Sequence, residues 1–543
     1  MTVDPRRAVA TVEHDGLLWF QLRLLSSLDT LRGPDETLGV SMTEDGNRVE
    51  ARCASSRWDE RVTVLETHPD RLEITTTVRG QGDLFTAHLL GGHRPPSGFL
   101  PSGSALDTVF SPNPDHPRRV LRPAVEPAVI GVTGDGAEPG VGRWLFCPAP
   151  WCYAVSRDDR WAALGLAAPI DEQTFTSFHY TGGTGGCALR LDYEGHTHVD
   201  GEFTTPTLVI QFGHTTPEGA IRAHGDLLRE RGLAPPVPTE AHRHWLEPIF
   251  CGWGAQGAAP AQSTQDNYDR FVTHLARHDV VPGTVVVDDK WAARYATCRA
   301  DESRWPDLRD WIAERHAVDQ RVLLWWKAWD PDGAPPEACV TLPDGTPVAL
   351  DPEHPLGRRT VVDAVTHMLG DLGADGLKVD FLAKTPSGTA LRHTGRRWGA
   401  ALLHHLLKLV YDTAKSIKPD ALIVTHTPNP AFADVADMIR LNDIRMLDAI
   451  DPDGPVVPHM RYRASVVAAA LPGMPVDSDG WCLPDRAEWR AYLDIQAELG
   501  VPALYYADRI DLSGEELTAE DLAEVSRMWG TYRRTLDEPR TSS

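Results

Sequence analysis

Residues 373–382 read GADGLKVDFL, and two charged side chains, Lys378 and Asp380, stand in the middle of this mostly apolar run. Charged residues are seldom buried unless they are paired or take part in chemistry. Because successive side chains of a strand point to opposite faces, Lys378 and Asp380 should share one face of a buried strand. The opposite face, packed against outer helices, should carry Leu377, Val379 and Phe381.

Apolar strands of this kind recur from residue 245 onward and alternate with helical patterns. Such alternation is typical of a parallel sheet that helices cover on both faces. The predicted strands lie at 249–254, 284–289, 322–327, 375–381, 421–426, 437–442, 471–476 and 502–506. The clearest predicted helices lie at 305–317, 360–373, 400–417 and 518–536. Eight units over about 300 residues predict an α/β fold, a (β/α)8 TIM barrel, with a short unit between the fifth and sixth strands.

The chain before the barrel has a different pattern. Clusters rich in Gly, Pro and Asp separate short β-rich runs, which include RVTVLE (61–66), RLEITTTV (71–78) and TLVIQF (207–212). Short strands with frequent turns indicate a β-sandwich, and a Thr-Pro pair opens a predicted helix at 216–232. The expected parts are an N-terminal β-sandwich at 1–215, a helical linker at 216–244 and a (β/α)8 catalytic barrel at 245–543.

Composition argues against several classes of protein. With 543 residues, 42% hydrophobic and 24% charged, the chain resembles a soluble protein that is too long for one core. A net charge of −24 argues against a nucleic-acid or anionic-membrane partner, and no run reaches the ~18 apolar residues of a membrane span. The N-terminus has no apolar signal segment, and the eight cysteines are scattered, so we expect a cytoplasmic protein with reduced thiols. Homo-oligomerisation is left open.

Polar and aromatic residues gather where the predicted barrel strands end, which is where such barrels carry their catalytic groups. One Asp after a strand is usually the N-cap of the next helix, but acids follow six of these strands. Carboxylates accept hydrogen bonds from hydroxyl groups, and aromatic faces stack on sugars, so this rim suits a carbohydrate. The candidate substrate-binding residues are Trp253, Asp288, Asp289, Trp325, Trp326, Lys378, His426, Arg440, Asp477 and Asp479.

Asp380 has the properties of a catalytic carboxylate. The ammonium group of Lys378, on the same strand face, favours the ionised acid, and this is the state that a nucleophile needs. Glycoside hydrolysis requires a second carboxyl group in a different environment. From this strand alone the alternative stays open that Lys378 and Asp380 form a buried ion pair without chemistry.

Five segments, in order, resemble the α-galactosidase (melibiase) clan, glycoside hydrolase families 27 and 36, and more loosely family 31. The segments are VVVDDKW (285–291), WPDLRDWIAERHAVDQRVLLWW (305–326), GLKVDF (376–381), IRLNDI (439–444) and LPGMPVDSD (471–479). In the family, the first binds sugar hydroxyls through its two acids, the third carries the nucleophile, and the fourth carries an Arg followed by the acid/base.

The resemblance implies a retaining α-glycoside hydrolase, α-galactosidase-like, that works by double displacement. It makes Asp380 the nucleophile and Asp443 the acid/base, with Asp448 as the second candidate for the acid. It implies no metal and no organic cofactor, and a carbohydrate as the substrate. Two carboxyl groups ~5–5.5 Å apart are expected for retention, against ~6.5–9.5 Å for inversion.

Three alternatives remain. Lys290 stands where the family motif has Gly or Cys, and VTHTPNP (424–430) departs from the family pattern. The first alternative is a glycosidase or transglycosidase of the same fold that acts on another sugar, such as an α-glucoside or an anionic sugar, and Lys290 and His426 are the residues that bear on it. An acidic rim also suits a metal-dependent enzyme, although Lys378 would compete with a cation. The third alternative is a non-catalytic carbohydrate-binding barrel.

Overall fold

The computed structural model describes residues 1–93, 100–112, 120–121, 128–130, 143–144, 148, 150–181, 185–238, 240–444 and 456–538. The chain divides into two compact units. The first, here called the antiparallel unit, contains Met1–Pro236, Ala383–His404 and Pro428–Ala431. The second, here called the barrel unit, contains Val237–Leu382, His405–Thr427 and Phe432–Ser543.

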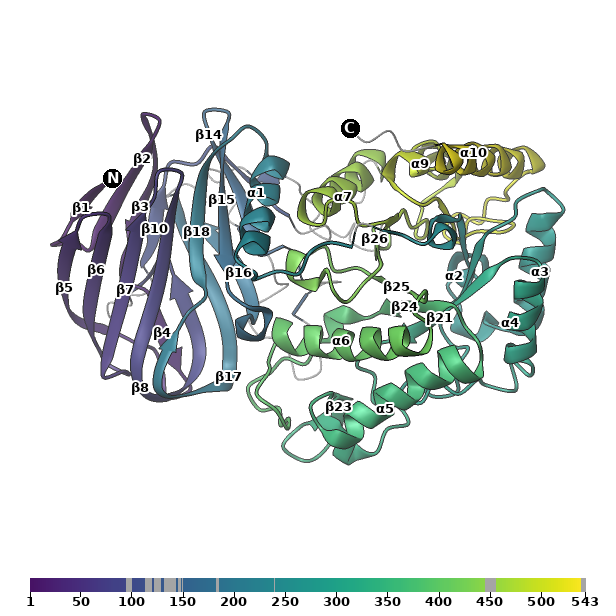
Figure 1. Cartoon of the computed structure of the whole chain (residues 1–543), viewed down its shortest axis with the longest axis horizontal. Helices are drawn as coiled ribbons and strands as arrows, with labels where there is room; N and C mark the ends of the chain where they lie inside the picture. The colour runs from purple at the N-terminus through teal and green to yellow at the C-terminus, as the bar shows by residue number, and fades with distance from the viewer. Residues whose placement is uncertain are drawn as a thin grey trace. The chain divides into compact units, whose positions relative to one another are not determined.

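Strands of the antiparallel unit pair antiparallel in all of their described pairings (Figure 1). In the first part of β8 alternate residues are buried, including Leu72, Ile74 and Val78, as expected for a strand with one face on a core. The three predicted runs lie in β7, β8 and β18. The strands are β1 (Thr2–Asp4), β2 (Val9–His14), β3 (Leu17–Arg23), β4 (Ser27–Thr30), β5 (Thr37–Asp45), β6 (Arg48–Ser55), β7 (Glu60–Thr67), β8 (Arg71–Leu89), β9 (Gly91–His93), β10 (Leu100–Ser104), β11 (Thr108–Phe110), β12 (Val120–Leu121), β13 (Ala128–Ile130), β14 (Cys152–Arg157), β15 (Arg160–Ala167), β16 (Phe175–Thr181), β17 (Gly186–Thr204) and β18 (Thr207–His214).

Helix α1 (Pro217–Glu230) follows the last of these strands. The hydroxyl of Thr216 accepts a hydrogen bond from the backbone N–H of Gly219 at 3.0 Å, so the Thr-Pro pair caps the helix as predicted. Leu227 and Leu228 pack with Val209 of β18 in one hydrophobic cluster. The helix that opens the predicted linker is therefore packed against the antiparallel unit.

Eight parallel strands form the sheet of the barrel unit, in the order β27-β26-β25-β24-β21-β20-β19-β28. An isolated parallel bridge between Asp477 and Val501 joins its two edges, so the sheet nearly closes into a barrel. All eight strands overlap the predicted ones. They are β19 (Ile249–Cys251), β20 (Thr284–Val287), β21 (Arg321–Lys327), β24 (Gly376–Asp380), β25 (Leu422–Thr425), β26 (Met438–Arg440), β27 (Val476–Asp477) and β28 (Ala503–Leu504).

Helices follow most of these strands and, in Figure 1, lie outside β21, β24 and β25. They are α2 (Gly252–Ala255), α3 (Gln265–Ala276), α4 (Leu308–Ala317), α5 (Pro355–Thr366), α6 (Ala400–Ile417), α7 (Val456–Ala470), α8 (Arg486–Leu493), α9 (Gln496–Leu499) and α10 (Ala519–Asp537). A small antiparallel pair, β22 (Cys339–Thr341) with β23 (Pro347–Leu350), follows β21. None of the described helices is both long enough and apolar enough to cross a bilayer.

Three details of the barrel bear on the predictions. Between β25 and β26 the chain forms only a 3-10 turn, Pro430–Phe432, which confirms the short unit. The seventh strand is shifted to Val476–Asp477, because the preceding residues end α7 and turn. Phe381 does not face the outer helices. Its φ of 60° turns the backbone at the end of β24, and the residue is 39% exposed.

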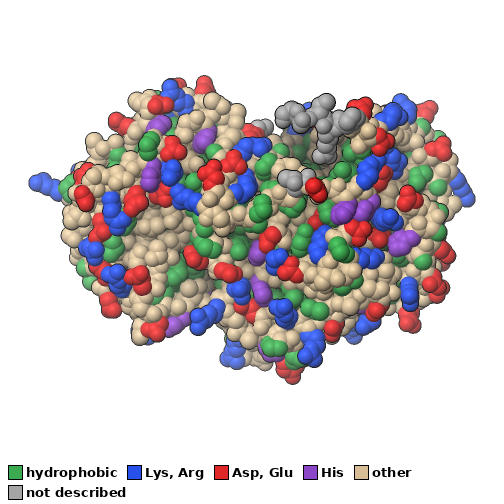
Figure 2. Space-filling view, in the orientation of Figure 1, with side chains coloured by type: hydrophobic (Ala, Val, Ile, Leu, Met, Phe, Trp, Pro, Cys, Tyr) green, Lys and Arg blue, Asp and Glu red, His purple; other side chains and the backbone are tan. Residues whose placement is uncertain are grey.

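On the face shown in Figure 2, acidic and basic side chains are interspersed. That face therefore presents no broad field of one sign that would select a polyanion.

Candidate active site

Lys378 and Asp380 lie on the same face of β24, but Lys378 does not pair with Asp380. Its ammonium nitrogen donates to Asp288 Oδ2 at 2.7 Å, and both side chains are buried. Cys251 Sγ lies 3.1 Å from the same oxygen. The predicted pairing within the strand is thus corrected: Lys378 reaches across β21 to the end of β20, where the acid is close enough for a direct ion pair.

Asp380 is held by other donors. Trp325 Nε1 donates to its Oδ2 at 3.0 Å, and the backbone N–H of Phe381 donates to its Oδ1 at 2.8 Å. Arg440 Nη2 and His426 Nε2 lie 3.5 Å and 4.0 Å from Oδ1. The carboxylate therefore sits among donors at the carboxyl ends of four strands of the barrel.

The surroundings of Asp380 favour its ionised form. Burial alone would raise its pKa, but Arg440, His426, Lys378 and the indole N–H of Trp325 outweigh burial, so the pKa lies below its ordinary value. Arg440 contributes more to this shift than Lys378 does. Burial lowers the pKa of His426 to about 4, so this imidazole is neutral near pH 7.

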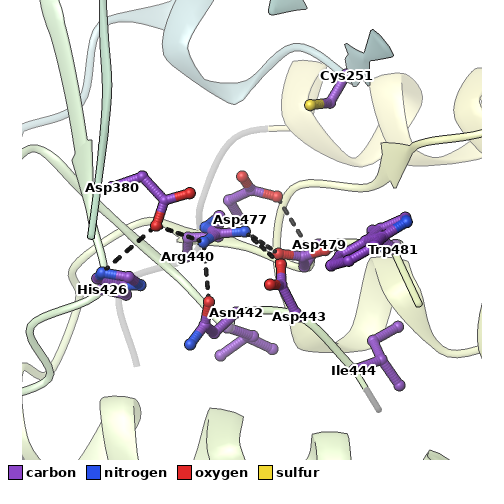
Figure 3. A network of polar contacts seen from close by, with 12 residues as sticks. Cys251, Asp380, His426, Arg440, Asn442, Asp443, Ile444, Asp477, Asp479 and Trp481 are labelled. Carbon is purple, nitrogen blue, oxygen red and sulfur yellow. Dashed lines mark hydrogen bonds and ion pairs between the residues drawn. The ribbon is translucent and has the colours of Figure 1, made fainter. Parts of the chain in front are cut away.

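One guanidinium group, that of Arg440, connects both predicted catalytic acids (Figure 3). Its Nη1 donates to Asp443 Oδ1 at 3.0 Å and to Asp479 Oδ2 at 2.8 Å. Its Nη2 faces Asp380 and donates to Asn442 Oδ1 at 2.8 Å. In Figure 3 the carboxyl groups of Asp380 and Asp443 lie on different sides of this guanidinium.

Asp443 has the opposite electrostatic setting to Asp380. Burial raises its pKa, Arg440 opposes that shift, and the negative charges of Asp479 and Asp380 add to it, giving a pKa of about 7. The two acids that share Arg440 therefore have very different pKa values. Asp380 stays a carboxylate, whereas Asp443 can release and take up a proton near neutral pH. Asp448, the second candidate acid, lies outside the described residues.

Asp477, the last residue of β27, and Asp479, two residues later, support Arg440 as a pair. Asp479 is fully buried; besides Arg440, its carboxylate accepts from the backbone N–H of Trp481 at 2.9 Å. Asp477 Oδ1 accepts from the N–H of Asp479 at 2.8 Å. Burial, with the charge of Asp479, raises the pKa of Asp477 to about 6. Asp479 therefore orients Arg440, while Asp477 orients Asp479.

The two acids after β20 have different settings. Asp288 is buried, and its carboxylate is occupied by Lys378 and by the backbone N–H of Asp289 at 2.9 Å. Asp289 is half-buried and accepts from the Tyr295 hydroxyl at 2.8 Å; burial raises its pKa. Asp289 is thus the more accessible of the two to a hydroxyl group of a ligand.

The predicted tryptophans are not all brought together. Trp325 contacts Asp380, whereas Trp326, the next residue of β21, points to the other face of the strand and is buried. Trp253 lies in the first turn of α2, beyond the strand, and its ring meets that of Trp481 edge to face at 5.8 Å. Trp326 therefore does not belong to this cluster.

Several contributing residues were not predicted. Cys251 and Asn442 contact Lys378 or Arg440, and Tyr505 lies with its ring centroid 5.2 Å from Lys378 Nζ. Asn442 lies between Arg440 and Asp443 in the sequence, and among these three residues only Asn442 could have been predicted, from that position.

Backbone strain marks the same end of the barrel. The segments that follow five of its strands each hold a non-glycine residue with a left-handed φ, a conformation that costs about 1–3 kcal/mol and concentrates at functional sites. These residues are Lys290 (69°), Trp329 (72°), Phe381 (60°), Asn442 (73°) and Asp479 (60°).

In the described part of the chain, no group of three or more His, Cys, Asp or Glu is arranged to hold a metal ion.

No family model matches the chain, and no curated protein matches it. Solved structures do. A family 31 sulfoquinovosidase from E. rectale, in complex with an aza-sugar inhibitor, is 10% identical with a TM-score of 0.65, over 98% of this chain and 83% of that one. An α-galactosidase from Thermus thermophilus in complex with stachyose is 14% identical with a TM-score of 0.55, over 90% and 99%.

A third similar structure is a cycloalternan-degrading enzyme from Trueperella pyogenes in complex with a covalent intermediate. It is 13% identical with a TM-score of 0.52, over 90% of this chain and 72% of that one. At these identities the likeness concerns the fold, and this chain shares its fold with enzymes that act on carbohydrates, among them a family 31 glycoside hydrolase and an α-galactosidase.

Proposed function

We propose that the protein is a retaining α-glycosidase that uses Asp380 as nucleophile and Asp443 as acid/base. The observation that carries this proposal is the shared Arg440, which contacts both acids while their pKa values shift in opposite directions. A double displacement needs this difference, because one carboxyl group must attack as an anion while the other donates a proton.

In the first step, Asp380 Oδ attacks the anomeric carbon and the bond to the leaving-group oxygen breaks. Asp443 donates its proton to that oxygen, so the aglycone leaves as a neutral alcohol and the sugar remains as an ester of Asp380. The N–H donors of Trp325 and Phe381 hold the attacking carboxylate in place.

In the second step, the Asp443 carboxylate takes a proton from water, and the resulting oxygen nucleophile attacks the anomeric carbon. The ester bond to Asp380 breaks, Asp380 returns as a carboxylate, and Asp443 is protonated again. Two inversions give overall retention. The covalent intermediate named for the Trueperella pyogenes enzyme fits this route.

We propose an α-galactoside as the first substrate to test, in line with the motif resemblance and with the Thermus thermophilus neighbour. Asp288, Asp289, Arg440, His426 and Trp325 are the proposed binding residues. We also propose that residues 1–215 form a β-sandwich scaffold, that 216–244 link it to a (β/α)8 catalytic barrel at 245–543, and that the protein is cytoplasmic.

The direct test replaces the proposed nucleophile. Asp380→Ala should lose at least about 1000-fold in kcat on aryl α-glycosides, because no covalent step remains. Adding azide should restore turnover and give a β-glycosyl azide, which NMR identifies. The wild-type enzyme should release the α-anomer first.

Asp412→Ala, at an exposed acid of α6, is the matched control and should keep wild-type activity. Full activity of Asp380→Ala would refute the assignment of the nucleophile. Release of the β-anomer by the wild-type enzyme would refute retention, and sugar binding without turnover would point to the non-catalytic barrel.

A further inference from the structure

Two lysine side chains meet at one tyrosine on the rim of the barrel. Lys290 Nζ lies 4.2 Å from the centroid of the Tyr295 ring, and Lys327 Nζ lies 4.5 Å from it. Both lysines are half-buried. An aromatic ring attracts cations, so Tyr295 holds two positive charges near each other that would otherwise repel.

This pair lies next to the proposed nucleophile. Lys327 is the last residue of β21 and is aligned with Asp380 in the parallel pairing of β21 with β24. Trp325, two residues earlier on the same face, donates to Asp380, and its ring meets that of Tyr295 at 6.0 Å. A sugar seated on Asp380 therefore has this rim beside it.

The acids near the pair give Lys290 no direct ion pair, although the charge of Lys290 acts on the neighbouring Asp289. Lys327 forms an ion pair with Asp330 at 2.6 Å, and Asp289 accepts from the Tyr295 hydroxyl. The nearby Asp332 pairs with Arg294. Across the described residues, no carboxylate lies within 4 Å of Lys290 Nζ.

The strained backbone of Lys290, with φ of 69°, fixes the direction in which this side chain leaves the loop. Lys290 is held in a costly conformation on the same tyrosine as Lys327, the neighbour of Asp380, and it forms no direct ion pair. Its ammonium group can therefore pair with a charge that comes with the ligand.

We infer that the enzyme acts on an α-glycoside whose sugar carries an anionic substituent, a carboxylate, sulfonate, sulfate or phosphate, which Lys290 binds with help from Lys327. This inference rests on the proposed function, because it places the sugar on Asp380. It makes Lys290 the residue that determines specificity.

The test uses matched aryl α-glycosides of galactose and glucose, each as the neutral sugar, the uronide, the 6-sulfo, the 6-sulfate and the 6-phosphate form. At least one anionic form should exceed its neutral parent in kcat/KM by about tenfold or more. Which form does so identifies the anion. Raising salt from about 0.05 to about 0.5 M should reduce this preference.

The ratio of anionic to neutral kcat/KM should fall about tenfold in Lys290→Met and less in Lys290→Arg, which keeps the charge. Lys408→Met, at a half-buried lysine of α6 that pairs with the exposed Asp412, is the control and should leave the ratio unchanged. Equilibrium binding of the free sugars by calorimetry provides a second measurement that needs no turnover.

The outcomes separate the two proposals. Turnover of neutral glycosides without preference for any anionic form, or a preference that Lys290→Met leaves intact, overturns this inference and leaves the proposed function standing. No turnover of any glycoside overturns the proposed function. In that case calorimetry decides this inference, because equal binding of anionic and neutral sugars would reject it.

Discussion

Arg440 sets the chemistry of the site at the scale of single residues. The guanidinium is buried and faces Asp380, Asp443 and Asp479 at once. One positive charge cannot neutralise three carboxylates, so the acid with fewer other donors keeps its proton to a higher pH. Asp380 has the N–H groups of Trp325 and Phe381 as additional donors. The asymmetry of the two acids therefore originates in these hydrogen bonds as well as in charge.

The pKa of Asp443 predicts the pH profile. As the general acid it must be protonated, and its pKa is raised to about 7. We expect kcat/KM on a glycoside with a poor leaving group to fall tenfold per pH unit above about pH 7. The lowered pKa of Asp380 keeps the nucleophile ionised throughout this range. Initial rates from pH 5 to 9 measure the profile.

Asp443→Asn provides the control for this assignment. It should reduce kcat/KM on a poor leaving group by about 100- to 10,000-fold at pH 7, and the remaining activity should no longer fall above pH 7. An activated aryl glycoside, which needs no acid, should lose much less. If the fall persists in Asp443→Asn, another group titrates and the assignment is wrong.

The ion pair of Lys378 with Asp288 makes a prediction about stability. Burial alone would lower the pKa of Lys378, but Asp288 and Cys251 raise it, so the lysine is an ammonium. Lys378→Met leaves Asp288 buried without its partner and should cost about 3–5 kcal/mol of unfolding free energy. The double variant Lys378→Met/Asp288→Leu should recover most of this loss, because no lone charge remains.

Urea unfolding followed by tryptophan fluorescence measures the difference. Lys408→Met removes the lysine of an exposed pair with Asp412 and should change stability by less than about 0.5 kcal/mol. If Lys378→Met and Lys408→Met lower the unfolding free energy equally, the buried ion pair contributes no more to stability than the exposed one.

At the scale of elements, the residues of the candidate site lie at strand ends, whereas the strand interiors stabilise the barrel through close packing. Gly376 opens β24, and a Cβ at this position would lie 2.0 Å from the Leu422 carbonyl oxygen of β25. Gly376→Ala should therefore separate β24 from β25 and destabilise the barrel unit by about 1–3 kcal/mol or more. Gly370→Ala meets nothing closer than 4.0 Å and is the matched control. Thermal unfolding of both variants tests this, and equal midpoints would contradict it.

The sequence predicts the positions of these strands well, because a buried parallel strand is a continuous apolar run that needs no information about its neighbours. It predicts the partner of Lys378 wrongly for the complementary reason. Asp380 is two residues from Lys378 on the same strand. Asp288 follows β20, two strands away in the sheet, and comes within reach of Lys378 only once the sheet has formed and curved. Strand alternation alone places Trp326 on the opposite face of β21 from Trp325, so its exclusion from the site could have been predicted. The left-handed turn at Phe381 was not, because no glycine marks it.

At the scale of the whole molecule, the two units should respond differently to acid. In the antiparallel unit, burial lowers the pKa of His196 and of His224 to about 4, so these imidazoles stay neutral in the folded state. The unfolded chain binds protons at these histidines below pH 6.5, so stability is full above pH 6.5 and is lost as pH falls towards 4. For the buried His224 this loss is about 2 kcal/mol at pH 5.

The barrel unit has an opposing contribution. Burial lowers the pKa of His426 to about 4, but the raised pKa values of Asp443, about 7, and Asp477, about 6, act in the other direction. These acids take up protons in the folded state before the unfolded chain does, so acidification below pH 7 stabilises the barrel unit through them. We therefore expect the antiparallel unit to lose stability first between pH 7 and 5.

Amide hydrogen exchange of the full chain at pH 7, 6 and 5, corrected for the intrinsic exchange rate, locates the loss. Peptides of β14, β15 and β18 should lose protection at a higher pH than peptides of β21 and β24. His224→Gln should reduce the pH dependence in the antiparallel unit, because the neutral amide cannot take up a proton on unfolding. His198→Gln, at a 67% exposed side chain, should leave it unchanged. Earlier loss of protection in the barrel peptides would mean that the buried histidine of that unit outweighs its two acids.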